Sequence, residues 1–117
     1  MFKVIIAGSR TFQDYELLKS YADYKLSHID DTIEIVSGSA RGADALGERY
    51  AKDRGYCLKI FPADWERYGK AAGYRRNAEM AGYADALIAF WDGKSRGTMH
   101  MINLAKQHKL KVAVKII

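Results

Sequence analysis

Proline and cysteine are scarce in this 117-residue sequence, which holds one residue of each, Pro62 and Cys57. A single cysteine excludes an internal disulfide and is typical of a reducing compartment. Because Cys57 lies within an apolar run, we expect it to fill part of the core. No Pro/Gly/Ser-rich or charge-block linker divides the chain, so we expect one domain over residues 1–117.

Long apolar segments are also missing. No stretch approaches the ~20 apolar residues that cross a bilayer. The short apolar run before Gly8 is too brief for a signal peptide. The sequence therefore predicts a cytoplasmic protein with no membrane partner. Since 49% of the residues are hydrophobic, disorder is excluded as well.

Negative charge is outweighed by positive charge, and the formal net charge is +5. This balance favours anionic ligands. The sign alone does not distinguish among nucleotides, nucleic acid and solvent counterions.

Short apolar segments alternate along the chain with segments of helical periodicity. Such alternation indicates right-handed βαβ units, hence an α/β Rossmann-like, doubly wound parallel sheet in order 3-2-1-4-5 with helices on both faces. Residues 62–74 show no clear pattern. The expected strands are 3–8, 32–37, 56–61, 84–91 and 111–117. The first expected helix is capped by Asp14 and has Tyr24 on its core-facing stripe. The others are 43–54, which Gly55 should end, 75–83 and 97–108.

Glycine-bearing loops follow three of the expected strands, at an edge where open α/β sheets bind anions. In the first loop, the guanidinium of Arg10 suits a phosphate, or it is only solvated. In the second loop, Gly38 and Gly42 allow close approach to a phosphate. Asp44 would accept hydrogen bonds from a ribose, or would only offset the helix dipole.

The third loop spans residues 92–98 and contains Gly93, Lys94 and Ser95. It is not a P-loop, because Ile88 stands where that motif requires glycine. Either it cradles a phosphate with its hydroxyls, glycines and cationic side chains, or it is simply a capped βα loop. The hydroxyls are those of Ser95 and Thr98, the glycines are Gly93 and Gly97, and the cations are Lys94 and Arg96.

Two further groups of residues have open interpretations. Arg75 and Arg76 near an expected helix start point to an anion nearby, or one of them only pairs with Asp64 or Glu66. The aromatic residues Trp65, Tyr68 and Tyr74 could stack on a base, cover the core or contact another subunit.

Residues suited to catalysis are few. His100 has no evident orienting partner, and no His/Cys spacing indicates a metal, so the sequence predicts neither metal nor cofactor. Asp44 and Asp92 are the remaining carboxylates near the predicted cleft.

The ordered motifs of this chain resemble the SLOG superfamily, Rossmann-like proteins named for the Smf/DprA and LOG lineages, and within it the small YspA/YpsA-related branch. The resemblance covers almost the whole chain. Its blocks are Ile6-Ala7-Gly8-Ser9-Arg10-x-Phe12, Ser37-Gly38-x-Ala40-Arg41-Gly42-Ala43-Asp44, Ala63-Asp64-Trp65, Gly69-Lys70, Ala72-Gly73, Arg76-Asn77-x-x-Met80, Ala84 to Trp91 and Asp92-Gly93-x-Ser95-x-Gly97-Thr98.

The resemblance implies one SLOG-type domain that binds a nucleotide or nucleotide-derived ligand, and a homodimer or larger homo-oligomer. It implies phosphate contacts at the loop glycines and hydroxyls and sugar contacts at Arg41, Asp44, Arg76 and Asn77. The predicted ligand-binding set is Gly8, Ser9, Arg10, Gly38, Arg41, Gly42, Asp44, Arg76, Asn77, Asp92, Gly93, Ser95, Gly97 and Thr98.

One departure from the resemblance bears on activity. The LOG enzymes, which cleave the N-glycosidic bond of nucleoside monophosphates, carry a glutamate where this chain has Met101. A thioether supplies neither a general base nor a charge for an oxocarbenium ion. Tyr74 also stands where the branch commonly has proline.

Three hypotheses follow for the function. The first is a non-catalytic binder of an ADP-ribose-like or cyclic nucleotide ligand that acts as a sensor or sequestering protein. The second is an N-glycosidic hydrolase of nucleoside monophosphates or NAD that uses Asp44 or Asp92. The third, ranked last, is a single-stranded nucleic-acid binder, which would show strong salt dependence.

Overall fold

The computed structural model describes all residues, 1–117, and consists of a five-stranded parallel sheet in the order β3-β2-β1-β4-β5. The doubly wound order expected from the sequence is therefore confirmed. Along the chain the elements are β1 (Phe2–Gly8), α1 (Tyr15–Leu26), β2 (Ile33–Ser37), α2 (Ala43–Arg54), β3 (Cys57–Ile60), α3 (Trp65–Tyr68), the 3-10 turn η1 (Gly69–Ala71), α4 (Ala72–Tyr83), β4 (Ala86–Trp91), α5 (Arg96–Gln107) and β5 (Lys111–Ile116).

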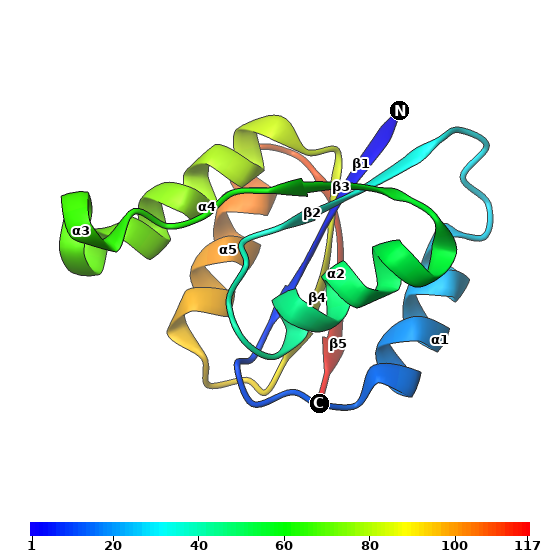
Figure 1. The fold of residues 1–117 in the computed structure, drawn as a ribbon, viewed down its shortest axis with the longest axis horizontal. Coiled ribbons are helices and arrows are strands. Elements are labelled where there is room, and N and C mark those ends of the chain that lie inside the picture. Colours follow the sequence, from blue (N-terminus) through cyan, green and yellow to red (C-terminus); the bar gives the residue numbers. More distant parts are fainter.

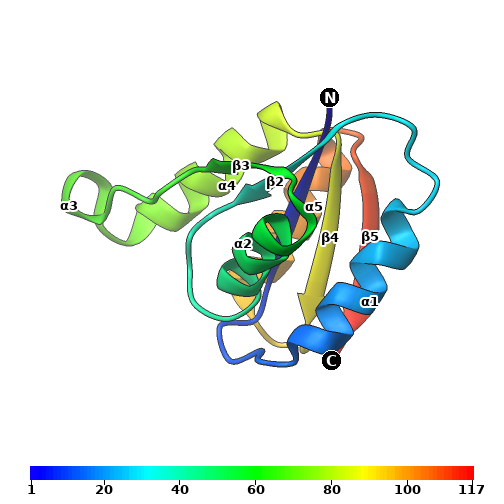
Figure 2. The same cartoon turned by 45° about the vertical axis from the view of Figure 1, so that its right-hand side comes forward.

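Helices cover both faces of the sheet, with α1 and α2 on one face and α4 and α5 on the other (Figures 1 and 2). Side chains of a strand alternate between its two faces. Accordingly, Val4 and Ile6 of β1 join the core beneath α1 and α2. Ile5 and Ala7 join the core beneath α4 and α5. β1 is therefore buried from Val4 to Ala7 and β4 from Ala86 to Phe90, as expected for strands covered on both faces.

The register of the sheet brings the carboxyl ends of three strands together. Gly8 at the end of β1 pairs with Phe90 of β4, and Ile5 pairs with Val36 of β2. The loops after β1, β2 and β4 consequently emerge side by side at one edge. This is the arrangement that order 3-2-1-4-5 predicted.

Two helix-end signals in the sequence are confirmed. The side chain of Asp14 accepts a hydrogen bond from the Leu17 amide at the start of α1. Gly55 ends α2 in the left-handed conformation, with φ of 71°. Asp and Gly are the residues favoured at these positions.

Residues 62–74 contain regular structure that the sequence did not reveal. The side chain of Asp64 caps the short helix α3, and α4 begins at Ala72, before Arg75. A helix this short has too few turns to show a periodic pattern. Together α3 and the first part of α4 extend beyond the sheet (Figure 1), and no residue of α3 or η1 is buried.

Two burial predictions were wrong. Cys57 is exposed, since β3 is an edge strand whose residues are all exposed, and a core role is thereby excluded. Tyr24 was expected on the core-facing stripe of α1 but is 71% exposed. The buried stripe instead begins at Tyr15 and continues through Leu18, Ala22 and Leu26 at helical spacing. None of the helices combines the length and apolar character that a membrane crossing requires.

Candidate functional site

Three cavities at the carboxyl edge of the sheet share Arg10 and Arg76 in their walls. Their volumes are about 450, 360 and 70 Å³. We call the largest the outer cavity and the smallest the inner cavity. Because the same two side chains border all three, the cavities adjoin one another, and we refer to them together as the cleft.

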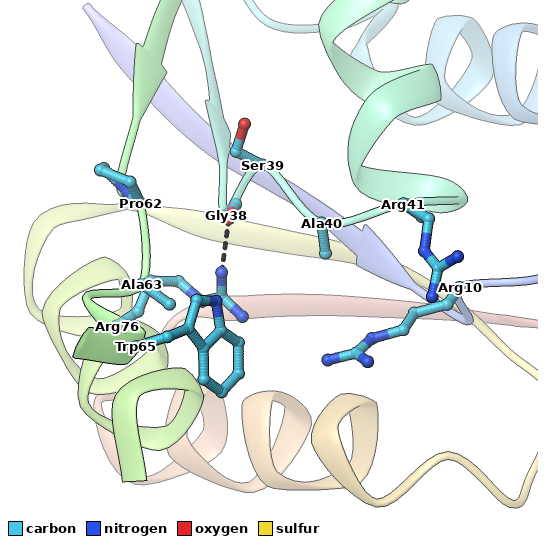
Figure 3. Close-up of a pocket in the computed structure, with 9 residues that line it drawn as sticks. All are labelled: Arg10, Gly38, Ser39, Ala40, Arg41, Pro62, Ala63, Trp65 and Arg76. Atoms are coloured by element: carbon cyan, nitrogen blue, oxygen red, sulfur yellow. Dashed lines mark hydrogen bonds between the residues drawn. The ribbon is translucent and has the colours of Figure 1, made fainter. Parts of the chain in front are cut away.

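The outer cavity lies between the loop after β2 and the segment that leads into α3 (Figure 3). Figure 3 shows Arg10 reaching across it toward the indole of Trp65, with Arg41 on the same side as Arg10. Ser39 in its wall has φ of 59°, which is uncommon for a residue other than glycine. The lining residues are Arg10, Gly38, Ser39, Ala40, Arg41, Pro62, Ala63, Trp65 and Arg76.

The inner cavity is where the three loops meet. The loop after β1 contributes Gly8, the loop after β2 contributes Ala40 and the β4–α5 segment contributes Ser95. The convergence expected from the strand order is therefore present. Asp44, Asn77, Thr98 and Met101 complete much of its wall.

Asp44 is the buried carboxylate of this cleft, at 5% exposure. Its Oδ2 accepts a hydrogen bond from the Ala40 amide at 3.2 Å. Burial raises the pKa of Asp44 to about 6, and nearby Glu48 adds to the rise, while the Ala40 amide and the charges of Arg76 and Arg10 act against it. The group can therefore change protonation state near neutral pH.

Arg76 and Asn77 connect α4 to two of the loops. The guanidinium of Arg76 donates to the Gly38 carbonyl and, at 3.1 Å, to Oδ1 of Asn77. Burial lowers the pKa of Arg76, although a guanidinium stays protonated in proteins. The Asn77 amide nitrogen donates to the Gly97 carbonyl at 3.3 Å and lies 3.2 Å from Nδ1 of His100.

The alternative pairing considered for Arg76 is not formed. Asp64 uses its carboxylate to cap α3, and Arg76 instead faces Asp44. Its neighbour Arg75 stacks on the ring of Tyr68 at 3.9 Å. Arg76 therefore braces the loop after β2 as well as lining the cleft.

Several glycines are required by close packing of the loops. A Cβ at Gly8 would lie 2.2 Å from the Phe90 carbonyl oxygen. At Gly42, where φ is 72°, it would lie 2.3 Å from the Ser9 carbonyl oxygen. At Gly38 it would meet the guanidinium of Arg76 at 2.7 Å. Gly8 and Gly42 therefore exclude larger residues whether or not a ligand is bound, whereas a larger residue at Gly38 would require the Arg76 side chain to shift.

The loop after β4 is held by its own side chains. Oδ1 of Asp92 accepts from the amides of Lys94 and Ser95, each at 2.8 Å, and these bonds lower the pKa of Asp92. The hydroxyls of Ser95 and Thr98 are 3.0 Å apart, and Ser95 caps α5. The capped-loop interpretation thus accounts for these hydroxyls, although both residues also border the inner cavity.

Most of the residues predicted to bind ligand lie in the walls of this cleft, and four do not. Ser9 is buried, and its hydroxyl accepts from the Asp92 amide at 3.3 Å. Gly42, Asp92 and Gly93 line none of the cavities. Those in the walls are Gly8, Arg10, Gly38, Arg41, Asp44, Arg76, Asn77, Ser95, Gly97 and Thr98.

The three aromatic residues with open roles are placed differently. Trp65 borders two of the cavities. Tyr74 borders one and packs edge-on against His100 with the ring centroids 4.5 Å apart. Tyr68 borders none, and its ring is covered by Arg75.

Some cleft residues were not predicted from the sequence. They are Ala7, Ser39, Ala40, Pro62, Ala63, Lys70, Gly73 and Met80. Asp64 followed by an aromatic residue was the available sign that a helix begins there, since aspartate favours the N-cap. No group of three or more His, Cys, Asp or Glu side chains is arranged to hold a metal ion.

Comparisons with known proteins agree with this fold. A family model described as the YspA, cpYpsA-related SLOG family matches residues 2–68. Gene 61 protein of Mycobacterium phage D29 is 36% identical over an alignment 119 residues long, gaps included. The alignment covers 96% of this chain and 94% of the phage protein.

Two solved structures are similar in fold. DNA processing protein A (DprA) from Streptococcus pneumoniae matches 97% of this chain with a TM-score of 0.75 and 18% identity. This chain spans 50% of that DprA chain. A predicted subunit of tRNA methyltransferase from Methanocaldococcus jannaschii DSM matches with a TM-score of 0.49 and 13% identity, a likeness too weak to carry an argument.

Proposed function

Because this chain belongs to the YspA, cpYpsA-related SLOG family, we propose that its cleft binds a nucleotide or nucleotide-derived ligand. The ligand is an ADP-ribose-like molecule or a cyclic nucleotide signal, and the protein acts as a sensor or sequestering protein without turnover. The observation that carries the proposal is the grouping of three adjoining cavities around Arg10 and Arg76 at the carboxyl edge of the sheet.

The charge and size of the cleft support an anionic ligand of nucleotide dimensions. Arg10, Arg41 and Arg76 line it, and Asp44 is the carboxylate among its lining residues. The outer cavity, at about 450 Å³, falls in the range of small-molecule sites. Guanidinium groups match phosphate geometry through paired donors.

The groups near the inner cavity favour binding without hydrolysis. Met101 is 1% exposed and lines this cavity, at the position where the resemblance to LOG enzymes would place a glutamate. His100 lies beside Asn77, and burial lowers its pKa. Neither side chain offers the charge that glycosidic cleavage needs.

One carboxylate keeps a hydrolase as the second candidate. Asp44 is buried in the cleft with its pKa raised to about 6, as suits a general acid or base at neutral pH. Asp92 is unsuited to that role, since its carboxylate is held by loop amides outside the cavities. Asp44→Asn would abolish turnover of nucleoside monophosphates or NAD if this candidate is correct.

Native mass spectrometry of freshly purified protein tests the proposal, before and after mild release of bound molecules. We expect an intact nucleotide derivative to accompany the chain, and the same spectrum gives the oligomeric state, for which we propose a homodimer or larger homo-oligomer. Calorimetry with a nucleotide panel follows. No binding at high micromolar concentration of any member would refute the proposal. Tighter, strongly salt-dependent binding of an oligonucleotide would favour a nucleic-acid ligand instead.

A further inference from the structure

The outer cavity has an aromatic side and a cationic side. The indole of Trp65 forms the aromatic side. Arg10 and Arg41 come from the other side, and the guanidinium of Arg10 reaches across toward the indole (Figure 3). An aromatic face and a pair of cations across one cavity suit a ligand that is planar at one end and anionic at the other.

Trp65 is placed as a wall of the cavity and not as part of the core. It is 51% exposed, and its helix α3 has no buried residue. A Cβ at Gly73 would lie 3.5 Å from Cη2 of the indole, an ordinary van der Waals contact, so one edge of the ring lies close to α4. The rest of the indole leaves an exposed surface at the cavity. An exposed indole beside a cavity can stack on a base.

Arg10 and Arg41 are free to bind an anion. The three ion pairs of the molecule involve Met1, Arg49 and Arg54, and neither Arg10 nor Arg41 takes part. Arg76, in contrast, already donates to Gly38 and Asn77. The available cationic donors therefore belong to the loops after β1 and β2.

The loop after β4 offers much less to a phosphate. Lys94 and Arg96 are exposed and border none of the cavities, and the hydroxyls of Ser95 and Thr98 hydrogen-bond to each other. The inner cavity beside them has about 70 Å³. The inner cavity is thus far smaller than the outer cavity, which has about 450 Å³.

We propose that the outer cavity binds a nucleoside diphosphate group, with the base against Trp65 and the two phosphates between Arg10 and Arg41. This inference rests on the proposed function and deepens it. It places the phosphates away from the loop after β4, where the resemblance alone would put half of the phosphate contacts.

The experiment is calorimetry with four probes, ADP, AMP, adenosine and inorganic pyrophosphate. The variants are Trp65→Ala, Arg41→Ala and Arg96→Ala. Two controls match the chemistry of the changes: Tyr24→Ala removes an exposed aromatic ring from α1, and Lys52→Ala removes an exposed cation from the far end of α2. All these side chains are exposed, so each variant is expected to fold, and circular dichroism checks this.

Wild-type protein is expected to bind ADP more tightly than AMP or adenosine. Trp65→Ala should weaken ADP binding about tenfold or more, the usual effect of losing a stacked base, and leave pyrophosphate binding unchanged. Arg41→Ala should weaken the binding of both ADP and pyrophosphate by about tenfold or more, because the variant lacks the guanidinium that would bond to the phosphates. Arg96→Ala and both controls should bind like wild type.

This experiment distinguishes a failure of this inference from a failure of the proposed function. If ADP binds but Trp65→Ala has no effect on it, or Arg96→Ala weakens binding as much as Arg41→Ala, this inference is wrong and the proposed function stands. If none of the four probes binds, this inference is overturned. The wider nucleotide panel then decides the proposed function.

Discussion

Replacing Asp44 with asparagine should make the protein more stable at neutral pH. The carboxylate is buried, and its pKa is raised from 3.8 to about 6. The folded state therefore holds the proton of Asp44 more tightly than the unfolded state does. As the pH rises through the interval between these two values, the free energy of unfolding falls, because the unfolded state gives up the proton more readily.

The size of this effect follows from the shift. About two pKa units at 1.36 kcal/mol per unit correspond to a penalty of about 3 kcal/mol above pH 6. Asparagine keeps an oxygen for the Ala40 amide and carries no charge, but its NH₂ group adds donors near Arg76. We therefore expect Asp44→Asn to raise the free energy of unfolding by roughly 1–3 kcal/mol at pH 7.5 and by little at pH 4.

Urea unfolding at a series of pH values between 4 and about 8 measures this difference directly. Asp92→Asn is the matched control with the opposite sign, because hydrogen bonds to loop amides lower the pKa of Asp92. Loss of the Asp92 carboxylate should lower the free energy of unfolding at pH values above the pKa of an aspartate in the unfolded chain. This effect should fade as the pH falls. An Asp44→Asn variant that is less stable than wild type at pH 7.5, or a difference that does not change with pH, would refute the reasoning.

Three further predictions concern stability and exposure. Gly42→Ala should destabilise the protein by about 1–3 kcal/mol, since φ there is 72°, whereas Gly97→Ala, with open space around its Cα, should be neutral or stabilising in the same thermal unfolding assay. Asp23→Ala should lower the free energy of unfolding by about 1–3 kcal/mol in urea titrations, because the hydroxyl of buried Tyr50 loses its acceptor; equal stability would contradict this. Cys57 should react with a thiol reagent in the native protein as fast as in urea, and protection from the reagent would contradict its exposure.

The sheet was predictable because its signals are local. The apolar run at 84–91 contains the buried strand β4. The side chain of Asp14 caps the start of α1, and Gly55 in the left-handed conformation ends α2. Strand order then followed from the alternation of strands with helices. That order was enough to predict that the loops after β1, β2 and β4 would meet.

The unpredicted features depend on tertiary contacts. Whether Cys57 is buried depends on which helix covers β3, and no local pattern around it reports that. Ser9 could have faced a ligand, yet it turns inward to the Asp92 amide of a loop far along the chain. Likewise, the sequence offered Arg76 two partners near it in the chain, and the structure gives it the Gly38 carbonyl instead.

Because α3 is exposed, the residues that stabilise the fold and the aromatic residue proposed to contact the ligand lie in different parts of the chain. Folding constrains β1, β4 and the tight glycines, where almost any substitution creates a clash or a cavity. Trp65 lies in a helix that contributes nothing to the core, so its replacement leaves the folded state nearly as stable. Residues 65–68 are consequently a segment in which ligand preference can diverge among relatives, by natural variation or by design, without compensating changes in the sheet.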